Sequence, residues 1–306
     1  MSADRILVTG GAGFIGSHLV RALVAAGHEV HVLDDFSTGN ARNLEGVGIA
    51  SLHRGNLDDL AKLAPELNKT RVVVHLAALI SGYDSLKAPD DYLAINVGGT
   101  LKVIDFARTA GVERILFASS STIYSQAEHA SEANLPAPKT VYASSKLTCE
   151  HLLGMYAPLV GYSHVSLRLF NVYGPRQNPN HPYANVTCKF SHAAARGLPI
   201  DLYGDGEQSR DFVYVDDVVA AFLTVLGGSR QSLYNVGTGT DVSINHMLAT
   251  VESVSGVKLS KRQLPPWPND TRRIRADVSR FTEEFGERTR VPLSEGLRRT
   301  IDYFRT

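Results

Sequence analysis

The stretch VTGGAGFIGSH constrains the fold of this chain more than any other. It places Gly10, Gly13 and Gly16 between an apolar run and a helical pattern that begins at Phe14. A strand, a glycine turn and a helix in this order are typical of a dinucleotide-binding unit. Gly10 suits a tight turn, Gly13 lets the backbone approach a pyrophosphate, and Gly16 lets helix and strand pack closely. The helix N-terminus then offers N–H groups and a positive dipole end to the phosphates.

Asp34 ends the next strand-like run, EVHVLDD, at the distance of about 20 residues expected for the acidic residue of such a unit. A carboxylate there accepts hydrogen bonds from the adenosine ribose hydroxyls and repels a 2′-phosphate. The pattern therefore favours NAD over NADP. The alternative is an ordinary strand–turn–helix unit that happens to contain three glycines.

Short apolar runs alternate with helical patterns through the first half of the chain. Such runs are typical of strands buried on both faces of a parallel sheet, so we expect an α/β fold with a doubly wound parallel Rossmann sheet. Beyond about Phe170 the rhythm breaks and Pro and Gly become denser, which predicts a smaller, loop-rich C-terminal substrate lobe. The expected division is residues 1–169 and 170–306, with a segment near 211–237 returning to the Rossmann sheet.

Composition excludes several classes of protein. The 306 residues contain 31 Lys and Arg against 31 Asp and Glu, so net charge gives no attraction to nucleic acid or to an anionic membrane. No apolar run reaches the roughly 18 residues of a membrane span, and the first strand-like run begins at Arg5, too early to follow a signal peptide. Cys149 and Cys188 form neither a disulfide framework nor a metal-ligand spacing. We expect a cytoplasmic protein without a metal.

The stretch YASSK suggests proton transfer. Tyr142 and Lys146 are four residues apart, so in a helix they share one face. A tyrosine titrates near pH 10, and a neighbouring ammonium together with a positively charged nicotinamide would lower that pKa. Ser120 lies in the serine run that ends an earlier apolar stretch, FASSS. The alternative is an amphipathic helix that merely exposes one aromatic and one charged side chain.

The glycine spacing and the Tyr-x-x-x-Lys pair together resemble the extended short-chain dehydrogenase/reductase family. Within that family the chain looks most like the UDP-sugar 4-epimerases. The resemblance covers nearly the whole chain and includes DDFSTG, HLAA, NVGGT, LRLFNVYGPRQNP, YGDGEQSRDFVYVDDV and YNVGTG. It implies that Ser120 hydrogen-bonds the reacting sugar hydroxyl, that Tyr142 is the proton carrier, and that Lys146 also hydrogen-bonds the nicotinamide ribose. The implied reaction inverts C4 of the sugar through a transient 4-keto intermediate.

The same resemblance implies two sets of binding residues. Those expected at NAD are Gly10, Gly13, Phe14, Ile15, Gly16, Asp34, Asp35, Asn56, Leu57, Leu76, Ala77, Ala78, Asn96, Ser119, Tyr142 and Lys146. Those expected at the nucleotide sugar are Ser120, Tyr142, Asn171, Asn185, Val186, Tyr203, Arg210, Asp270 and Ile274. Tyr203 is expected to border the uracil and Arg210 to pair with the diphosphate. The alternatives are a core tyrosine and a solvated surface arginine.

Two positions depart from the family pattern. Trp267 stands where a second diphosphate-binding arginine is usual, so either Arg272 or Arg273 substitutes for it or the substrate carries another nucleotide or sugar. Asn56 replaces the usual aspartate near the adenine, where an amide still hydrogen-bonds. Ile274 is intermediate in size between the side chains of members that exclude and accept N-acetylated sugars. We therefore expect both UDP-glucose/galactose and the N-acetylated pair as substrates.

Other functions remain open on this scaffold. A nucleotide-sugar 4,6-dehydratase usually carries an acidic pair after the catalytic serine or threonine, where this chain has Ser121 and Thr122. A reductase, a 3,5-epimerase or a non-catalytic NAD-sensing protein would share the fold. Helices around 90–109 and 142–158 pair into a four-helix bundle in the family, which implies a homodimer; an apolar face buried within one chain is the alternative.

Overall fold

The computed structural model describes residues 3–125, 127–181, 184–266 and 271–306. Two compact units make up the chain, and each consists of several segments. The first unit comprises Met1–Tyr124, Leu135–Arg168 and Val219–Tyr234, and the second comprises Ser125–Asn134, Leu169–Val218 and Asn235–Thr306. The chain thus passes between the units several times, and Val219–Tyr234 of the first unit lies within the segment near 211–237 that is expected to return to the Rossmann sheet.

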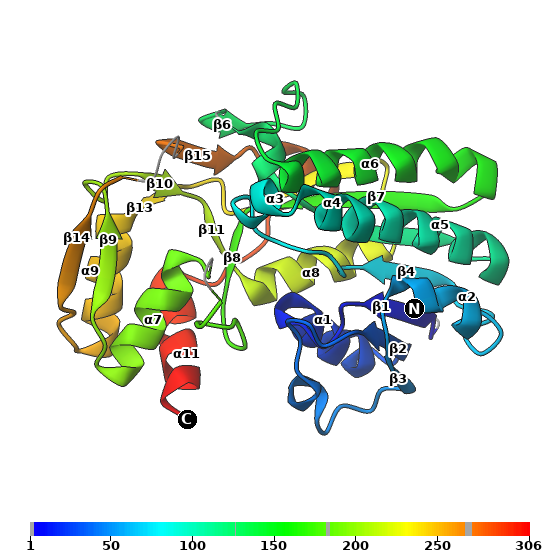
Figure 1. Cartoon of the computed structure of the whole chain (residues 1–306), viewed down its shortest axis with the longest axis horizontal. Coiled ribbons are helices and arrows are strands. Elements are labelled where there is room, and N and C mark those ends of the chain that lie inside the picture. The colour runs from blue at the N-terminus through cyan, green and yellow to red at the C-terminus, as the bar shows by residue number, and fades with distance from the viewer. Residues whose placement is uncertain (1–2, 126, 182–183, 267–270) are drawn as a thin grey trace. The chain divides into compact units, whose positions relative to one another are not determined.

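A seven-stranded sheet forms the centre of the first unit (Figure 1). Its strands are β1 (Arg5–Thr9), β2 (Glu29–Asp34), β3 (Ser51–Arg54), β4 (Val72–His75), β5 (Arg114–Ser120), β7 (Ser163–Leu169) and β12 (Leu233–Val236). The order across the sheet is β12-β7-β5-β4-β1-β2-β3, and β1, β2, β3, β4 and β5 pair in parallel. This arrangement confirms the predicted α/β Rossmann fold. The carboxyl ends of β1, β2, β4 and β5 consequently meet at one edge of the sheet.

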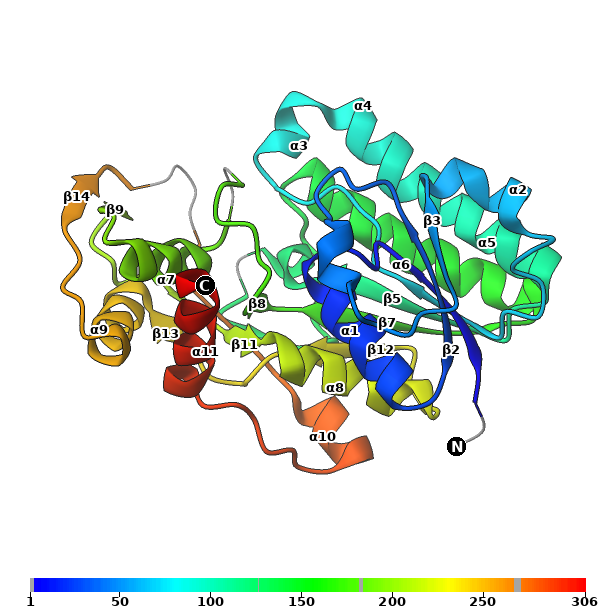
Figure 2. The same cartoon turned by 90° about the horizontal axis from the view of Figure 1, so that it is seen from below.

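Helices cover both faces of this sheet. They are α1 (Phe14–Ala25), α2 (Leu60–Leu63), α3 (Asp84–Lys87), α4 (Pro89–Tyr92), α5 (Gly99–Ala110), α6 (Val141–Val160) and α8 (Val215–Leu226). Single turns of 3-10 helix occur at η1 (Ala41–Leu44), η2 (Leu57–Asp59) and η4 (Ser121–Tyr124). Figure 2 shows α5 and α6 on one face of the sheet and α1 on the other.

Local sequence explains where the main helices begin and end. Thr140 caps α6 by accepting a hydrogen bond from the Ala143 N–H at 3.1 Å. Gly111 follows α5 with φ 71°, a left-handed conformation that glycine adopts without strain. The predicted helix over 90–109 is interrupted, because residues Leu93–Gly98 form a π-helical turn, η3. Such turns are commonly found next to functional sites.

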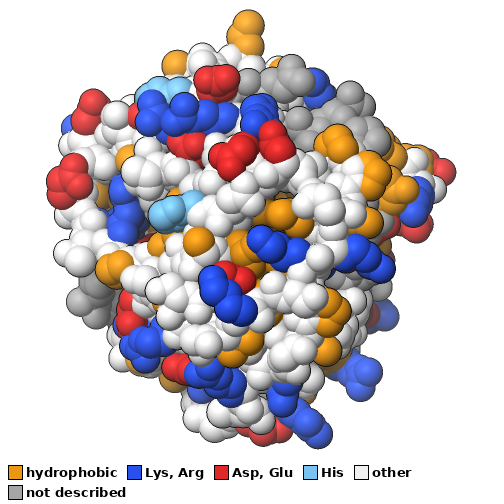
Figure 3. Space-filling view, turned by 90° about the vertical axis from the view of Figure 1, so that its left-hand side faces the viewer, with side chains coloured by type: hydrophobic (Ala, Val, Ile, Leu, Met, Phe, Trp, Pro, Cys, Tyr) orange, Lys and Arg blue, Asp and Glu red, His pale blue; other side chains and the backbone are white. Residues whose placement is uncertain are grey.

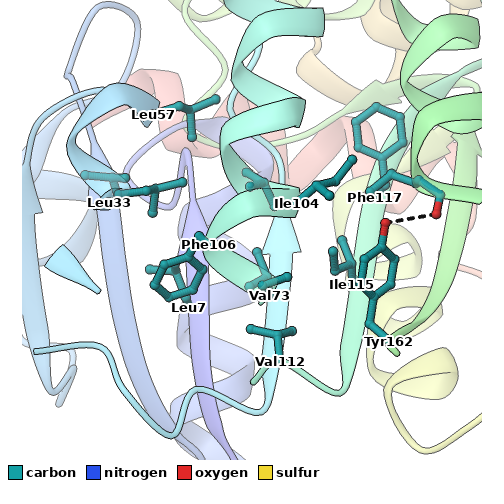
Figure 4. Packing of buried hydrophobic residues seen from close by; sticks show 14 of the residues in the cluster. Leu7, Leu33, Leu57, Val73, Ile104, Phe106, Val112, Ile115, Phe117 and Tyr162 are labelled. Carbon is teal, nitrogen blue, oxygen red and sulfur yellow. Dashed lines mark hydrogen bonds between the residues drawn. The ribbon is translucent and has the colours of Figure 1, made fainter. Parts of the chain in front are cut away.

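The core of the first unit lies between the sheet and the helices α5 and α6 (Figure 4). Val73, Ile115 and Phe117 face this layer from the central strands and are at most 1% exposed. Burying one such side chain stabilises the fold by about 1.5–3 kcal/mol relative to leaving it in water. The Tyr162 hydroxyl, shown in Figure 4, donates to the Leu153 carbonyl at 3.0 Å, so its polar end is satisfied inside the core.

The second unit has smaller sheets. Its strands are β6 (His129–Ala130), β8 (Asn171–Tyr173), β9 (Ile200–Tyr203), β10 (Ser209–Arg210), β11 (Phe212–Tyr214), β13 (Val242–Ser243), β14 (Lys261–Leu264) and β15 (Arg273–Ala276). They form a four-stranded sheet in the order β13-β10-β15-β6 and the pairs β11-β8 and β14-β9. The helices are α7 (Val186–Arg196), α9 (Ile244–Ser255), α10 (Ser279–Phe285) and α11 (Leu293–Arg305), of which α7, α9 and α11 pack together.

The surface shows no strong segregation of charge on the face in Figure 3, where basic and acidic side chains are interspersed. Within the described residues, none of the helices has both the length and the apolarity needed to cross a membrane. The described residues also contain no group of three or more His, Cys, Asp or Glu side chains that could hold a metal ion.

Candidate functional site

The glycine turn between β1 and α1 has the geometry of a phosphate cradle. Gly10 has φ 71°, and a Cβ at this position would lie 2.8 Å from the backbone nitrogen of Ala77. A Cβ on Gly16 would overlap the Gly10 carbonyl oxygen. Gly13 is the N-cap of α1, and no side chain of the described residues caps the helix. The first N–H groups of α1, from Phe14 and Ile15 onward, are thus left for an anion, as the pyrophosphate of NAD requires.

Asp34 fastens this turn to the end of β2. One carboxylate oxygen accepts from the Ala12 N–H at 2.8 Å and the other accepts from the Phe36 N–H at 2.8 Å. Burial raises the pKa of Asp34, while these backbone hydrogen bonds act in the opposite direction. Each oxygen keeps lone-pair capacity for a further donor such as a ribose hydroxyl. The residue therefore fits an adenosine ribose, and it also has a structural role that the sequence does not reveal.

The remaining predicted cofactor residues lie on loops at or near the carboxyl edge of the same sheet. Leu76, Ala77 and Ala78 follow β4 and are half-buried. Asn56 is exposed after β3 and caps η2, where its side chain accepts from the Asp58 N–H at 2.8 Å. The exposed Asp35 accepts from Ser37, and Leu57 is buried against Gly99. These loops follow β2, β3 and β4, and their contact with NAD stays a prediction.

Two residues predicted to contact NAD form hydrogen bonds within the protein. The Asn96 amide donates to the Leu79 carbonyl (3.1 Å) and to the Ser145 hydroxyl (3.0 Å), and its oxygen accepts from the Leu79 N–H (2.8 Å). The Ser119 hydroxyl donates to Glu150 at 2.5 Å. Both side chains are at most 3% exposed, so they also have structural roles that the sequence does not reveal.

Tyr142, Lys146 and Ser120 are brought together by the packing of α6 on β5. The Lys146 ammonium donates to the Ala118 carbonyl at 2.8 Å and lies 4.7 Å from the centroid of the Phe117 ring. Ser120 lies next to Tyr142 and lowers the pKa of its phenol, and the Ser120 hydroxyl lies 2.9 Å from that of Thr122. The strand end and the helix thus present the hydroxyl, the phenol and the cation as a single group.

The electrostatics of this group differ in one respect from the prediction. Burial raises the pKa of Tyr142, partly offset by the hydrogen bond with Ser120, whereas the sequence analysis predicts a lowered value from the charges of Lys146 and a nicotinamide. In the protein without bound nicotinamide, burial is the largest influence on the pKa of Tyr142. Burial also lowers the pKa of Lys146 to about 8, opposed by the charges of Cys149 and Glu150.

The second unit contains a cavity of about 230 Å³. Five of the predicted substrate residues line it, namely Asn171, Asn185, Val186, Tyr203 and Arg210. The Asn185 side chain caps α7 by accepting from the Cys188 N–H at 3.0 Å, and its amide donates to the Val172 carbonyl at 2.7 Å. Asn185 therefore shapes the cavity wall, and the N-terminus of α7 opens on the cavity with its positive dipole end.

The lining also includes residues that the sequence analysis does not predict. They are Phe190, Asp201, Leu202, Gln208, Phe212 and Ile244. The Gln208 amide donates to the Tyr203 carbonyl at 2.9 Å, and Asp201 forms a two-point ion pair with Arg262 at 2.7 and 2.8 Å. Most of these residues are apolar or lie within a strand, and none belongs to a motif that the sequence would reveal. Only the nearness of Gln208, two residues before Arg210, could have indicated its place in the lining.

Ile274, on β15, is 7% exposed and pairs with Arg210 of β10, but it is not among the residues that line the cavity. Trp267 and Asp270 fall outside the described residues. Arg272 pairs with Asp205 at 2.8 Å, and Arg273 pairs with Asp241 at 2.9 Å. Neither arginine lines the cavity, so the structure gives no support to their predicted substitution for the family arginine.

Comparisons with known proteins agree along nearly the whole chain. A profile described as "NAD dependent epimerase/dehydratase family" matches residues 6–237. A UDP-glucose 4-epimerase from Mycolicibacterium smegmatis is 38% identical over 312 residues, covering 98% of each chain.

Solved structures extend this similarity to the fold. The UDP-glucose 4-epimerase of Thermus thermophilus in complex with NAD has a TM-score of 0.91 and 38% identity, with 98% of this chain and 99% of that chain covered. A UDP-N-acetylglucosamine 4-epimerase from Methanobrevibacter ruminantium, in complex with UDP-N-acetylmuramic acid, has a TM-score of 0.93 and 32% identity, with 99% of both chains covered. Epimerases named for UDP-glucose and for UDP-N-acetylglucosamine thus share this backbone fold.

Proposed function

Because this chain belongs to the NAD dependent epimerase/dehydratase family, we propose that it is a 4-epimerase of UDP-hexoses. The proposed substrates are UDP-glucose and UDP-galactose, with the N-acetylated pair as a second couple. The observation that carries the proposal is the joint placement of Ser120, Tyr142 and Lys146 where α6 packs on β5. Supporting it are the similar epimerases that cover nearly the whole chain.

In the proposed reaction, Tyr142 takes the proton of the sugar 4-hydroxyl and later returns it. The Ser120 hydroxyl, which lies next to Tyr142, orients the reacting oxygen. The Lys146 ammonium stabilises the phenolate that forms in the transition state, when charge develops on the half-buried ring. When bound at the glycine turn and Asp34, NAD supplies a hydride acceptor that is regenerated within each cycle.

The nucleotide is proposed to bind in the cavity of the second unit. Tyr203 offers an aromatic face to a base, and the Arg210 guanidinium, together with the N-terminus of α7, offers positive charge to a diphosphate. Val186 is the first residue of α7 and supplies one of the unpaired N–H groups of that end. We place the diphosphate at this end of the cavity.

A dehydratase is the second candidate, because the family includes both reactions. Removing the sugar 6-hydroxyl as water requires an acid/base pair close to the catalytic serine. Ser121 and Thr122 stand there, and the Thr122 hydroxyl is 2.9 Å from that of Ser120. Neither side chain has the acidity for that step, which favours the epimerase.

A homodimer is proposed from the helices α5 and α6. Leu101 on α5 is 39% exposed, and Met155 and Leu159 on α6 are 57% and 75% exposed. Apolar side chains exposed together on packed helices indicate a surface that another chain covers. The two buried cysteines are both free, which suits the proposed reducing cytoplasm.

The test is to incubate the purified protein with UDP-glucose and, separately, with UDP-N-acetylglucosamine. We expect the galactose and N-acetylgalactosamine epimers to accumulate without net consumption of added NAD. Accumulation of a 4-keto product would favour the dehydratase, and no turnover of either sugar would contradict the proposed function. Size-exclusion chromatography with light scattering tests the dimer in the same preparation.

A further inference from the structure

Behind the proposed catalytic group lies a buried ion pair that the proposed mechanism does not use. Arg168 on β7 donates to Glu150 on α6 through Nε at 2.9 Å and through a terminal nitrogen at 2.7 Å. Their side chains are 3% and 8% exposed. The Arg168 guanidinium also lies 4.8 Å from the centroid of the Tyr124 ring. The pair is therefore a fixed, desolvated element of the first unit.

The pair is connected to the active-site strand through Ser119. The Ser119 hydroxyl donates to the Glu150 oxygen that also accepts from Arg168 Nε. On α6, Glu150 follows Lys146 by four residues and Tyr142 by eight, so the three share one helix face. Lys146 bonds Ala118, Glu150 bonds Ser119, and Tyr142 interacts with Ser120. Three turns of α6 thus hold three successive residues of β5.

Stability alone is a poor explanation for such a pair. Removing two charges from water costs much of what their attraction returns, and apolar side chains of similar volume often stabilise a core at least as well. A buried carboxylate and guanidinium next to a proton-transfer site therefore suggest an electrostatic or positioning role.

Lys146 is the group on which that charge would act. The groups that face it are Cys149 and Glu150 on its own helix and the buried His75 at the end of β4. Tyr142 lies one turn away on α6, and the Tyr92 ring packs edge-on against Tyr142 from α4. Of these, Glu150 forms the ion pair, and its charge raises the pKa of Lys146.

We propose that Glu150 and Arg168 form a positioning pair, which keeps Lys146 charged and holds the Ser120 end of β5 in place against α6. This inference rests on the proposed use of Tyr142 as the base. Arg168 fixes the carboxylate, and the carboxylate acts on Lys146 by charge and on Ser119 by hydrogen bonding. Neither residue needs to touch the substrate.

The test measures the titration of Lys146 directly. Protein with isotope-labelled lysine is titrated by NMR, following the Cε resonance that disappears in Lys146→Arg. In the parent we expect a midpoint near pH 8. In Glu150→Gln, which preserves size but has one acceptor oxygen in place of two, we expect a midpoint roughly one pH unit lower, as loss of a nearby opposite charge predicts. At about pH 7.5 the charged fraction of Lys146 would then fall about threefold.

A second variant separates charge from folding. Glu150→Leu with Arg168→Met replaces the pair by apolar side chains of similar size, so a merely structural role predicts normal titration and normal turnover. Our proposal predicts a folded protein in which Lys146 titrates at lower pH than in the parent, as in Glu150→Gln. Asp105→Asn, which removes an exposed carboxylate paired with Arg108 on α5, is the matched control and should change nothing.

Turnover gives an independent readout. With UDP-glucose, the alkaline decline of kcat should begin at lower pH in both Glu150 variants, while KM changes little. An unchanged Lys146 midpoint in a folded variant would overturn the proposal. If the parent turns over no sugar, the proposed function fails, yet the NMR titration still decides whether Glu150 controls the charge of Lys146.

Discussion

His75 makes the first unit sensitive to acid in a way that can be calculated. Its ring lies between the hydroxyls of Thr9 and Thr100, at 2.8 and 3.1 Å, and is 1% exposed. Burial, helped by the charge of Lys146, lowers its pKa from 6.5 to about 3. The unfolded chain therefore binds a proton below about pH 6.5, whereas the folded protein does not until about pH 3. Stability must fall as the pH falls through this window.

The magnitude follows from the size of the shift. Each pH unit inside the window costs about 1.4 kcal/mol, so lowering the pH to about 4 removes roughly 3 kcal/mol through His75 alone. The whole window is worth about 5 kcal/mol at most. His75 ends β4 directly before Leu76, one of the predicted cofactor residues. We therefore expect acid to destabilise the carboxyl edge of the sheet as well.

Urea denaturation of the parent and of His75→Gln, at about pH 7 and about pH 4, measures the effect. Glutamine can still hydrogen-bond the two threonines but does not titrate. The loss of unfolding free energy between the two pH values should be about 3 kcal/mol smaller in the variant. His246→Gln, at an exposed position on α9, should behave like the parent. Equal pH dependence in the parent and His75→Gln would show that His75 is not a buried neutral group and would refute the calculation.

Three further outcomes are expected. Tyr142→Phe should reduce kcat by about 10²–10⁴-fold while bound NAD remains after purification. The control Tyr156→Phe, on the same helix, should keep normal activity. Substantial turnover in Tyr142→Phe would mean that another group is the base. Asp34→Ala should weaken NAD binding and reduce the discrimination against NADP, as measured by calorimetry with both cofactors. It should also lower the thermal midpoint, because two backbone N–H groups lose their acceptor. NADP as the main cofactor of the parent would refute the role of Asp34. Gly16→Ala should abolish NAD binding, since its Cβ would overlap the Gly10 carbonyl, whereas Gly48→Ala, whose Cβ would lie 3.8 Å from its nearest neighbour, should bind NAD normally.

The fold could be predicted because it depends on local patterns. The glycine turn, the alternation of strands with helices and the acidic end of β2 each follow from residues close together in the sequence. The same holds for Tyr142 and Lys146, whose spacing places them on one helix face. Their pKa values could not be predicted, since these depend mainly on burial, which arises from packing against segments remote in sequence.

Long-range partners account for the other differences. Ser119 and Asn96 match the family pattern, but Glu150 and Leu79 occupy their polar atoms, and neither partner is adjacent to them in the sequence. The π-helical turn at Leu93–Gly98 likewise departs from a helical pattern that looks continuous. The place of Ser125–Asn134 in the second unit could not be predicted either, because it depends on the pairing of β6 with β15, which is remote in the sequence.

The position of β12 at the edge of the large sheet has a consequence during synthesis on the ribosome. Its neighbour β7 ends at Leu169, but β12 begins only at Leu233. At about 5–20 residues per second, the outer edge of β7 stays unpaired for several seconds after it has emerged. An open strand edge recruits other chains, so nascent protein is exposed to aggregation during this interval. A chain truncated at residue 169 would keep that edge permanently open and should require chaperones to remain in solution.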